Sequence, residues 1–238
     1  MANDWFQFKE FKIHQAGASM KVGTDGVLLG AWANVSDVKR VLDIGTGTGL
    51  LALMIAQRNS QAVIDAIEIE EQAAHQAEIN FRNSPWQKRL NLYNQSLQEF
   101  MLQSLNKYDL IICNPPFFSN SLKALGTERT LARHSDLLSS AILIESVLIL
   151  LSDEGRFSII LPVQDGQILT MKLIEKGVHL NRQMNVIPVP GKPVKRLMLE
   201  FSKQVKNIKE ETLIIESDGR HHYSNEYKNL TQDFYLFL

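Results

Sequence analysis

The sequence predicts an α/β fold with a mostly parallel central sheet and helices on both faces. Short apolar runs of β-forming residues alternate with stretches of helical composition along most of the chain, as in parallel α/β sheets. The 238 residues suffice for one large domain with a sizeable core. With 45% hydrophobic and 21% charged residues, the composition is that of an ordinary globular protein.

The first five expected strands are buried and parallel, because most of the apolar runs are too short to be helices. These strands cover residues 41–44, 62–69, 90–93, 108–113 and 156–161. The stretches of helical composition predict helices at residues 50–58, 70–83, 97–105, 136–151 and 164–176. Strand and helix therefore alternate from residue 41 to residue 176.

The pattern changes after Gly177. Residues 178–188 and 194–201 are two strand-like runs joined by VPGKP, whose glycine and prolines predict the turn of a hairpin that closes the sheet. A further β-branched run, TLIIES, begins at Thr212, and its place in the fold is not predicted. We expect a single domain over residues 1–238, with an N-terminal cap at 1–38, a core at 39–203 and a C-terminal extension at 204–238.

Charge and cysteine content exclude several classes of protein. The 25 basic and 26 acidic residues give a net charge of −1, which argues against a strongly basic protein that coats nucleic acid and leaves a local basic patch open. The single cysteine, Cys113, cannot form an internal disulfide, and no Cys/His cluster has zinc-ligand spacing. Residues 1–13 lack the basic start and the continuous apolar stretch of a signal peptide, and no run approaches the roughly 20 apolar residues of a membrane helix. We expect a cytoplasmic protein without metal or membrane.

A glycine-rich loop follows the strand at residues 41–44, in the run VLDIGTGTGLLAL. Gly45, Gly47 and Gly49 let the backbone turn sharply and approach a ligand at the start of the next helix. A dinucleotide-binding loop would have its third glycine at position 50, where Leu50 stands, so NAD is disfavoured. Asp43, just before the glycines, suits a ligand with a cationic group.

A second acidic residue, Glu68, lies near the end of the next predicted strand. It follows Gly45 by 23 residues, close to the spacing of about 20 expected for a carboxylate that binds ribose hydroxyls. Glu70 and Glu71 are interpreted as first-turn acids favoured by the helix dipole. Glu68 is therefore the candidate ribose ligand.

The motif Asn114-Pro115-Pro116-Phe117 directly follows the predicted strand at 108–113. Because neither proline has an N–H, the segment presents mainly acceptors, the Asn114 side-chain oxygen and the Pro115 carbonyl. Two acceptors that draw the hydrogens of an exocyclic amine out of plane would localise the nitrogen lone pair and make it nucleophilic. Phe117 offers a face for a planar base, and such stacking contributes about 1 to 3 kcal/mol.

In this order, the motifs resemble those of the class I S-adenosylmethionine-dependent methyltransferases, specifically the amino-group branch with an Asn-Pro-Pro-aromatic motif. The resemblance covers residue 20 to about residue 201. FKIHQAGASMKVGTDGVLLGAWA before the glycine loop, and LARHS at 131–135, resemble a bacterial branch that methylates N6 of an adenosine beside the anticodon. The resemblance implies a Rossmann-like, seven-stranded sheet with an antiparallel last strand, S-adenosylmethionine as cofactor, and tRNA, specifically tRNA-Val, as partner.

The resemblance also implies roles for individual residues. The cofactor would be held by Lys21, Gly23, Thr24, Asp25, Asp43, Gly45, Thr46, Gly47, Gly49, Glu68 and Asn114. The target amine would be held by the catalytic group Asn114, Pro115, Pro116 and Phe117. The family's usual acid after the third strand is replaced by NQSLQ, in which Gln95 or Ser96 would accept a hydrogen bond from the cofactor adenine. Arg133 and His134 either contact RNA phosphate or pack within their own loop.

Three functions remain open at this point: an RNA adenine-N6 methyltransferase, a protein glutamine-amide methyltransferase and a catalytically silent cofactor-binding module. A glutamine amide offers two N–H donors, as adenine does, so the motif alone does not separate them. The amide enzymes usually carry a separate helical domain at the N-terminus, for which about 40 residues are too few. A silent module would be expected to lose Asn114. The adenine methyltransferase is therefore the leading interpretation.

Overall fold

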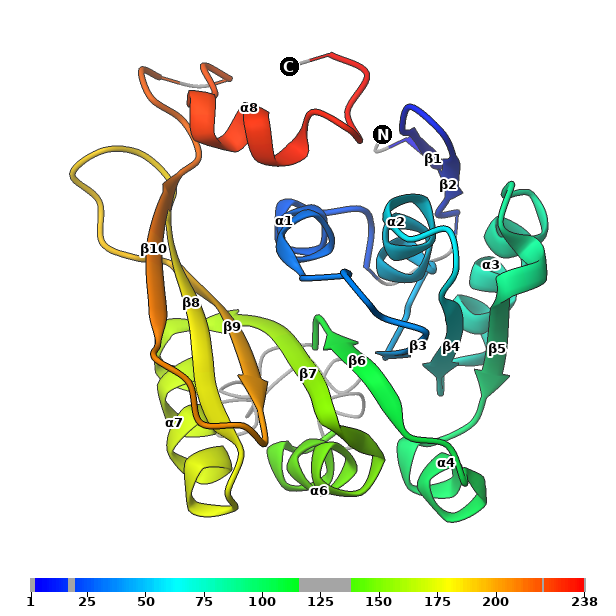
Figure 1. Ribbon diagram of the computed structural model, residues 1–238. Coiled ribbons are helices and arrows are strands. Elements are labelled where there is room, and N and C mark those ends of the chain that lie inside the picture. The colour runs from blue at the N-terminus through cyan, green and yellow to red at the C-terminus, as the bar shows by residue number, and fades with distance from the viewer. Residues whose placement is uncertain (1–2, 17–19, 116–137, 220, 238) are drawn as a thin grey trace, which may run out of the picture.

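The computed structural model describes residues 3–16, 20–115, 138–219 and 221–237, and its elements are arranged around one large sheet (Figure 1). The strands are β1 (Trp5–Gln7), β2 (Lys12–His14), β3 (Arg40–Ile44), β4 (Val63–Glu68), β5 (Leu90–Asn94), β6 (Tyr108–Cys113), β7 (Leu151–Pro162), β8 (His179–Ile187), β9 (Arg196–Ser202) and β10 (Lys209–Ile214). The helices are α1 (Thr24–Trp32), α2 (Leu50–Arg58), α3 (Glu71–Arg82), α4 (Leu97–Gln103), α6 (Ser140–Leu150), α7 (Val163–Glu175) and α8 (Asn225–Thr231).

The large sheet has the strand order β10-β8-β9-β7-β6-β3-β4-β5, and β1 and β2 form a separate antiparallel pair. Within the described residues, β9 is antiparallel to both of its neighbours and every other pair in the large sheet is parallel. The predicted α/β fold is confirmed. The predicted hairpin is also present, with β8 and β9 as its two arms, but it does not close the sheet, because β10 lies outside β8.

The sheet has one strand more than the seven expected. The eighth strand, β10, lies outside β8 and pairs with it in parallel from Lys209 to Ile214. Leu213 of β10 is buried in the same core as Met184 and Val186 of β8. Pairing of β10 at the edge of the sheet therefore removes the apolar Leu213 side chain from water. The β-branched run in the tail therefore extends the sheet.

Helices cover both faces of this sheet (Figure 1). On one face, α1, α2, α3 and α8 pack on a core that includes Val41 and Leu110. On the other face, α4, α6 and α7 pack on a core that includes Leu42 and Ile111. Neighbouring residues of β3 and of β6 thus enter opposite cores, because successive side chains of a strand point to opposite faces.

The parallel register aligns the carboxyl ends of the central strands. Ile44 of β3 pairs with Ile67 of β4 on one side and with Cys113 of β6 on the other. The residues that follow these three in the sequence are, in order, Gly45, Glu68 and Asn114. The strand order reverses between β3 and β6, and ligands of open α/β sheets bind at such a switch point, outside the carboxyl ends.

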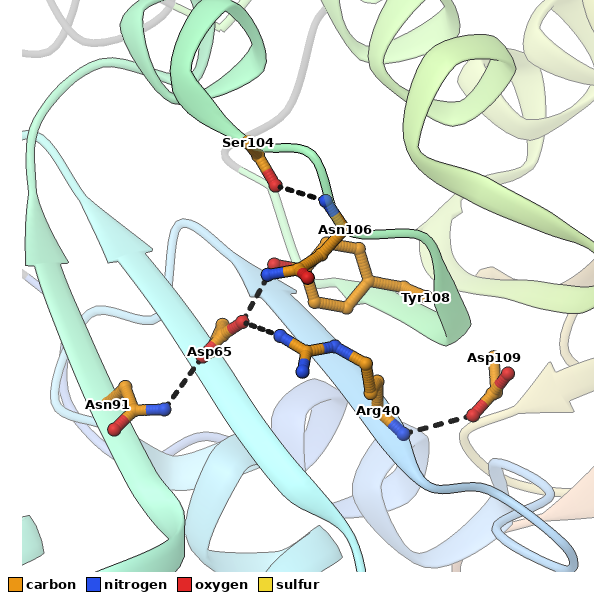
Figure 2. Close-up of polar contacts among 7 residues, drawn as sticks. All are labelled: Arg40, Asp65, Asn91, Ser104, Asn106, Tyr108 and Asp109. Carbon is orange, nitrogen blue, oxygen red and sulfur yellow. Dashed lines mark hydrogen bonds and ion pairs between the residues drawn. The ribbon is translucent and has the colours of Figure 1, made fainter.

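A buried polar network stabilises the opposite end of these strands (Figure 2). Asp65 of β4 is 2% exposed and accepts hydrogen bonds from the Tyr108 hydroxyl at 2.7 Å, from Asn91 Nδ2 at 2.8 Å and from Arg40 Nη2 at 3.1 Å. Burial, together with the hydrogen bond to Asp65, raises the pKa of Tyr108 above its ordinary value, so the phenol stays a donor. The network joins β3, β4, β5 and β6.

Asp65→Asn is expected to lower the free energy of unfolding by about 2 kcal/mol, because the Arg40 guanidinium loses its charged partner and a buried acceptor is replaced. Urea denaturation would measure the change. The matched control is Asp153→Asn, since Asp153 is 90% exposed and its ion pair with Lys203 contributes little. Equal losses in the two variants would contradict a stabilising role for the network.

Candidate active site

The glycine-rich loop between β3 and α2 has a backbone that only glycine adopts easily. Gly45, Gly47 and Gly49 have φ angles of 67°, 58° and 84°, in the left-handed region that side chains with a Cβ rarely enter. A Cβ on Gly49 would lie 2.5 Å from the Phe81 ring, whereas one on Gly45 or Gly47 would meet nothing within 4 Å. The first two glycines therefore leave open space beside the loop, where a ligand can approach the backbone.

Asp43, the acid before this loop, is fully buried. Its Oδ2 accepts hydrogen bonds from Thr46 Oγ1 at 2.5 Å and from the Ala52 amide at 3.1 Å, while Oδ1 is buried without a hydrogen-bond partner. Burial raises the pKa of the Asp43 carboxyl to about 7; the two hydrogen bonds oppose this shift and the nearby Glu68 adds to it. Asp43 and Thr46 thus hold the loop, and Oδ1 remains available for a cationic group.

Glu68 lies directly across from the glycine loop. Its Oε2 accepts a hydrogen bond from the Gly47 amide at 2.8 Å, and its Oε1 accepts one from the Glu70 amide at 2.9 Å. A carboxylate offers about four lone-pair sites, so both oxygens retain acceptor capacity for two adjacent hydroxyls. The backbone of the loop is itself tied to β4 by the Thr46 amide, which donates to the Ile67 carbonyl at 2.9 Å.

Asn114 follows β6 at the same edge of the sheet, half-buried, and Pro115 after it is buried. The start of α1 lies beside Asn114, since a Cβ on Gly26 would be 3.5 Å from Asn114 Nδ2 and 2.9 Å from the Leu50 side chain. The fold thus brings together the start of α1, the start of α2 and Asn114, which are distant in the sequence.

The predicted cofactor residues before Gly26 lie just before α1 and in its first turn. Lys21, Gly23 and Thr24 are exposed, and Gly23 is the N-cap residue of the helix. Asp25 forms an ion pair with Arg196 of β9, with 2.7 Å between Oδ2 and Nε. Arg196 was not among the predicted residues, and no local sequence signal identifies it. The pair engages the Asp25 carboxylate within the protein; a contact of Asp25 with the cofactor stays a prediction.

Asn80 of α3 is a further site residue that the motifs do not reveal. Its Nδ2 donates to the carbonyls of Thr48 at 2.8 Å and His14 at 2.9 Å, and its Oδ1 accepts from the His14 amide at 2.8 Å. Asn80 is 1% exposed and therefore ties the glycine loop to β2. The sequence signal for Asn80 was its position as a polar residue on the same side of α3 as the buried Ala77 and Phe81.

Ser96 and Gln95, the predicted partners of the cofactor adenine, follow β5. Ser96 is the N-cap residue of α4 and forms a capping box with Glu99, in which the Ser96 Oγ accepts from the Glu99 amide and the Ser96 amide donates to the Glu99 carboxylate. This cap explains why α4 begins at Leu97. Gln95 is half-buried. The hydrogen bond to the cofactor adenine stays a prediction for both residues.

Four predicted residues, Pro116, Phe117, Arg133 and His134, lie outside the described residues. Within the described ranges, no group of three or more His, Cys, Asp or Glu side chains could hold a metal ion. Cys113 is buried, and burial raises the pKa of its thiol, which disfavours the reactive thiolate. None of the described helices is long and apolar enough to span a bilayer.

The hydrogen-bond acceptors of the site and the open side of its glycine loop suit S-adenosylmethionine. The unpaired Oδ1 of Asp43 offers a partner for an amino group, Glu68 offers acceptors for ribose hydroxyls, and the open side of Gly45 and Gly47 admits close approach. Asn114, at the same edge of the sheet, adds a further side-chain acceptor.

Comparison with known proteins identifies the family of the chain. Residues 20–140 match the family model described as "Methyltransferase small domain". The chain is 46% identical over 237 residues, covering 99% of both chains, to the tRNA1(Val) (adenine(37)-N6)-methyltransferase of Parabacteroides distasonis. It is 44% identical over 238 residues, again 99% of both chains, to the protein of the same name in Trichodesmium erythraeum.

The chain belongs to the tRNA1(Val) (adenine(37)-N6)-methyltransferase family. Its fold is also similar to that of a predicted O-methyltransferase from Agrobacterium tumefaciens, with a TM-score of 0.66 and 18% identity over 88% of this chain and 96% of that one. S-adenosylmethionine is the cofactor of the family.

Glu68→Ala is expected to weaken S-adenosylmethionine binding by about 1.5 to 3 kcal/mol, the range for a hydrogen bond to a charged group, because the ribose acceptors are lost. Isothermal titration calorimetry measures the dissociation constant, with Glu71→Ala as the control, since Glu71 is exposed on the first turn of α3. An unchanged dissociation constant in a folded Glu68→Ala protein would remove Glu68 from the site and direct attention to Glu70.

Proposed function

We propose that the protein transfers a methyl group from S-adenosylmethionine to N6 of adenosine 37 in tRNA1(Val). The observation that carries this proposal is the position of Asn114, which follows β6 beside the glycine loop that suits the cofactor. Relatives about 45% identical to this chain over its length are named tRNA1(Val) (adenine(37)-N6)-methyltransferases, which supports tRNA1(Val) as the substrate.

Asn114 and Pro115 supply the chemistry that the chain itself contributes. When bound, S-adenosylmethionine supplies an electrophilic methyl group on its sulfonium. The Asn114 side-chain oxygen and the Pro115 carbonyl accept hydrogen bonds from the target amine and draw its two hydrogens out of the plane of the base. The nitrogen lone pair is then localised toward the methyl group, and this interaction strengthens as the amine becomes tetrahedral in the transition state.

A nucleotide in a loop fits this site better than one in a duplex. A base must leave its stack to reach a pocket at the edge of the sheet, which costs least in a single-stranded loop. Because the net charge is −1, the protein can neutralise few phosphates, and non-specific RNA affinity should be weak. Recognition should therefore depend on tRNA shape beyond the loop, and an isolated anticodon stem-loop should be a poor substrate.

The whole chain forms one functional unit in this proposal. Residues 1–38 cap the cofactor, residues 39–203 form the catalytic core, and residues 204–238 form an extension that adds β10 to the sheet. Since its substrate is tRNA, the protein would act in the cytoplasm.

The decisive test incubates purified protein and radiolabelled S-adenosylmethionine with total tRNA or total protein from a strain that lacks the gene. The expected result is label in intact tRNA-Val only, with mass spectrometry of nuclease digests locating the methyl group on adenosine 37. Label on a protein glutamine would favour the amide methyltransferase, and label on rRNA alone would overturn the substrate. No label in any pool, with cofactor bound, would indicate a silent module.

A further inference from the structure

We propose that the turn between β8 and β9, residues 188–195, binds the tRNA backbone beside the active site through Lys192 and Lys195. This inference rests on the proposed tRNA substrate and assigns to the protein a surface that contacts the tRNA. Both lysines are exposed. Neither makes an ion pair or a side-chain hydrogen bond with any residue that the structure describes.

The turn lies at the active-site edge of the sheet. Because β8 is parallel to the central strands, its carboxyl end at Ile187 is on the same edge as Asn114. The turn returns into β9 at Arg196, whose guanidinium pairs with Asp25 on the first turn of α1. Gly26, the next residue, lies against Asn114 and Leu50. The Arg196–Asp25 ion pair and the packing of Gly26 against Asn114 therefore connect the base of the turn to the proposed catalytic asparagine.

The conformation of the turn is fixed before any ligand binds. The Lys195 amide donates to the Val186 carbonyl at 2.9 Å, and the Lys192 amide donates to the Val189 carbonyl at 3.2 Å. Gly191 has a φ of 76°, and three prolines in the turn restrict the remaining backbone. Little backbone entropy is lost when such a segment binds, so its charges contribute more of their interaction energy to affinity.

The charge of the turn is suited to phosphate. The segment PVPGKPVK contains two lysines and no acidic residue. The neighbouring segment after β10 contributes Glu216, but its Oε1 accepts a hydrogen bond from the His221 amide at 2.8 Å and is thus engaged locally. On a chain with a net charge of −1, a local basic projection beside the pocket attracts the RNA backbone without coating the protein with nucleic acid.

The test compares two double variants that change the net charge equally. Lys192→Glu/Lys195→Glu reverses the charge of the turn, and Lys176→Glu/Lys206→Glu reverses two exposed lysines at the opposite edge of the sheet. The tRNA-Val dissociation constant is measured by fluorescence anisotropy at several salt concentrations. KM for tRNA, kcat and the S-adenosylmethionine dissociation constant are measured alongside.

We expect the turn variant to raise the tRNA dissociation constant and KM by about tenfold or more, and to reduce the salt slope of binding by about one for each lysine. The kcat at saturating tRNA and the affinity for S-adenosylmethionine should stay unchanged, and the control should bind tRNA nearly as the wild type does. Equal behaviour of the two variants would overturn the inference. A wild-type protein that binds tRNA but methylates another RNA would overturn the proposed substrate instead, and the binding data would still decide the role of the turn.

Discussion

Asn114→Ala is expected to slow methyl transfer by about 100- to 1000-fold under single-turnover conditions, comparable to the loss of one positioned hydrogen-bonding group in other active sites. Cofactor affinity should change little, because the asparagine oxygen acts on the target amine in the transition state. Rapid-quench measurement of tRNA methylation gives the rate, and calorimetry with S-adenosylmethionine gives the affinity.

The control for this variant is Asn207→Ala, in the exposed connection between β9 and β10 at the opposite edge of the sheet. It loses the same side chain and should retain the wild-type rate. A wild-type single-turnover rate in Asn114→Ala would show that the proposed activation of the amine is wrong. A large loss of cofactor affinity would instead assign Asn114 to cofactor binding, as its place beside the start of α1 also allows.

Asp43→Asn is expected to separate stability from cofactor binding. The pKa of Asp43 in the folded protein is about 7, above its ordinary 3.8, because the carboxyl is buried. Ionisation of Asp43 therefore destabilises the folded state. The contribution of Asp43 to the stability of the wild type is greatest below its ordinary pKa and is lost as the pH rises through about 7. An asparagine does not titrate, so the stability of the variant relative to the wild type should increase by about 2 to 3 kcal/mol between pH 5 and pH 8.

The same variant should bind S-adenosylmethionine about 10-fold or more weakly, because the oxygen available for a cationic group loses its charge. Urea denaturation at pH 5 and pH 8 measures the first effect, and calorimetry at pH 8 measures the second. Asp153→Asn is the control, since the Asp153 carboxylate is 90% exposed. A stability difference that does not change with pH would show that Asp43 does not titrate in this range, and unchanged affinity would remove it from the cofactor site.

The sequence by itself determined the alternating strands and helices from residue 41 to residue 176, the hairpin after them, and the order of the site motifs. The predicted helix at residues 50–58 agrees with α2, and the predicted strand at 108–113 agrees with β6. The predicted helix at 136–151 is shorter in the structure, because the Ser139 hydroxyl caps α6 at the Ile142 amide. These features depend on periodicity, turn residues and caps, which act over a few neighbouring residues. The glycine loop and Asn114 were predicted for the same reason, since each directly follows a strand.

Only the tertiary structure decided which distant groups meet. The Asp25–Arg196 pair joins residues 171 positions apart, and Asn80 reaches the glycine loop across 32 positions. The parallel pairing of β10 with β8 and the complete burial of Asp43 likewise depend on how the layers pack. Such contacts form between residues that are far apart in the sequence and that the fold brings close together in space. No local pattern specifies them, because hydrogen bonds and ion pairs depend on distance in space and not on distance along the chain.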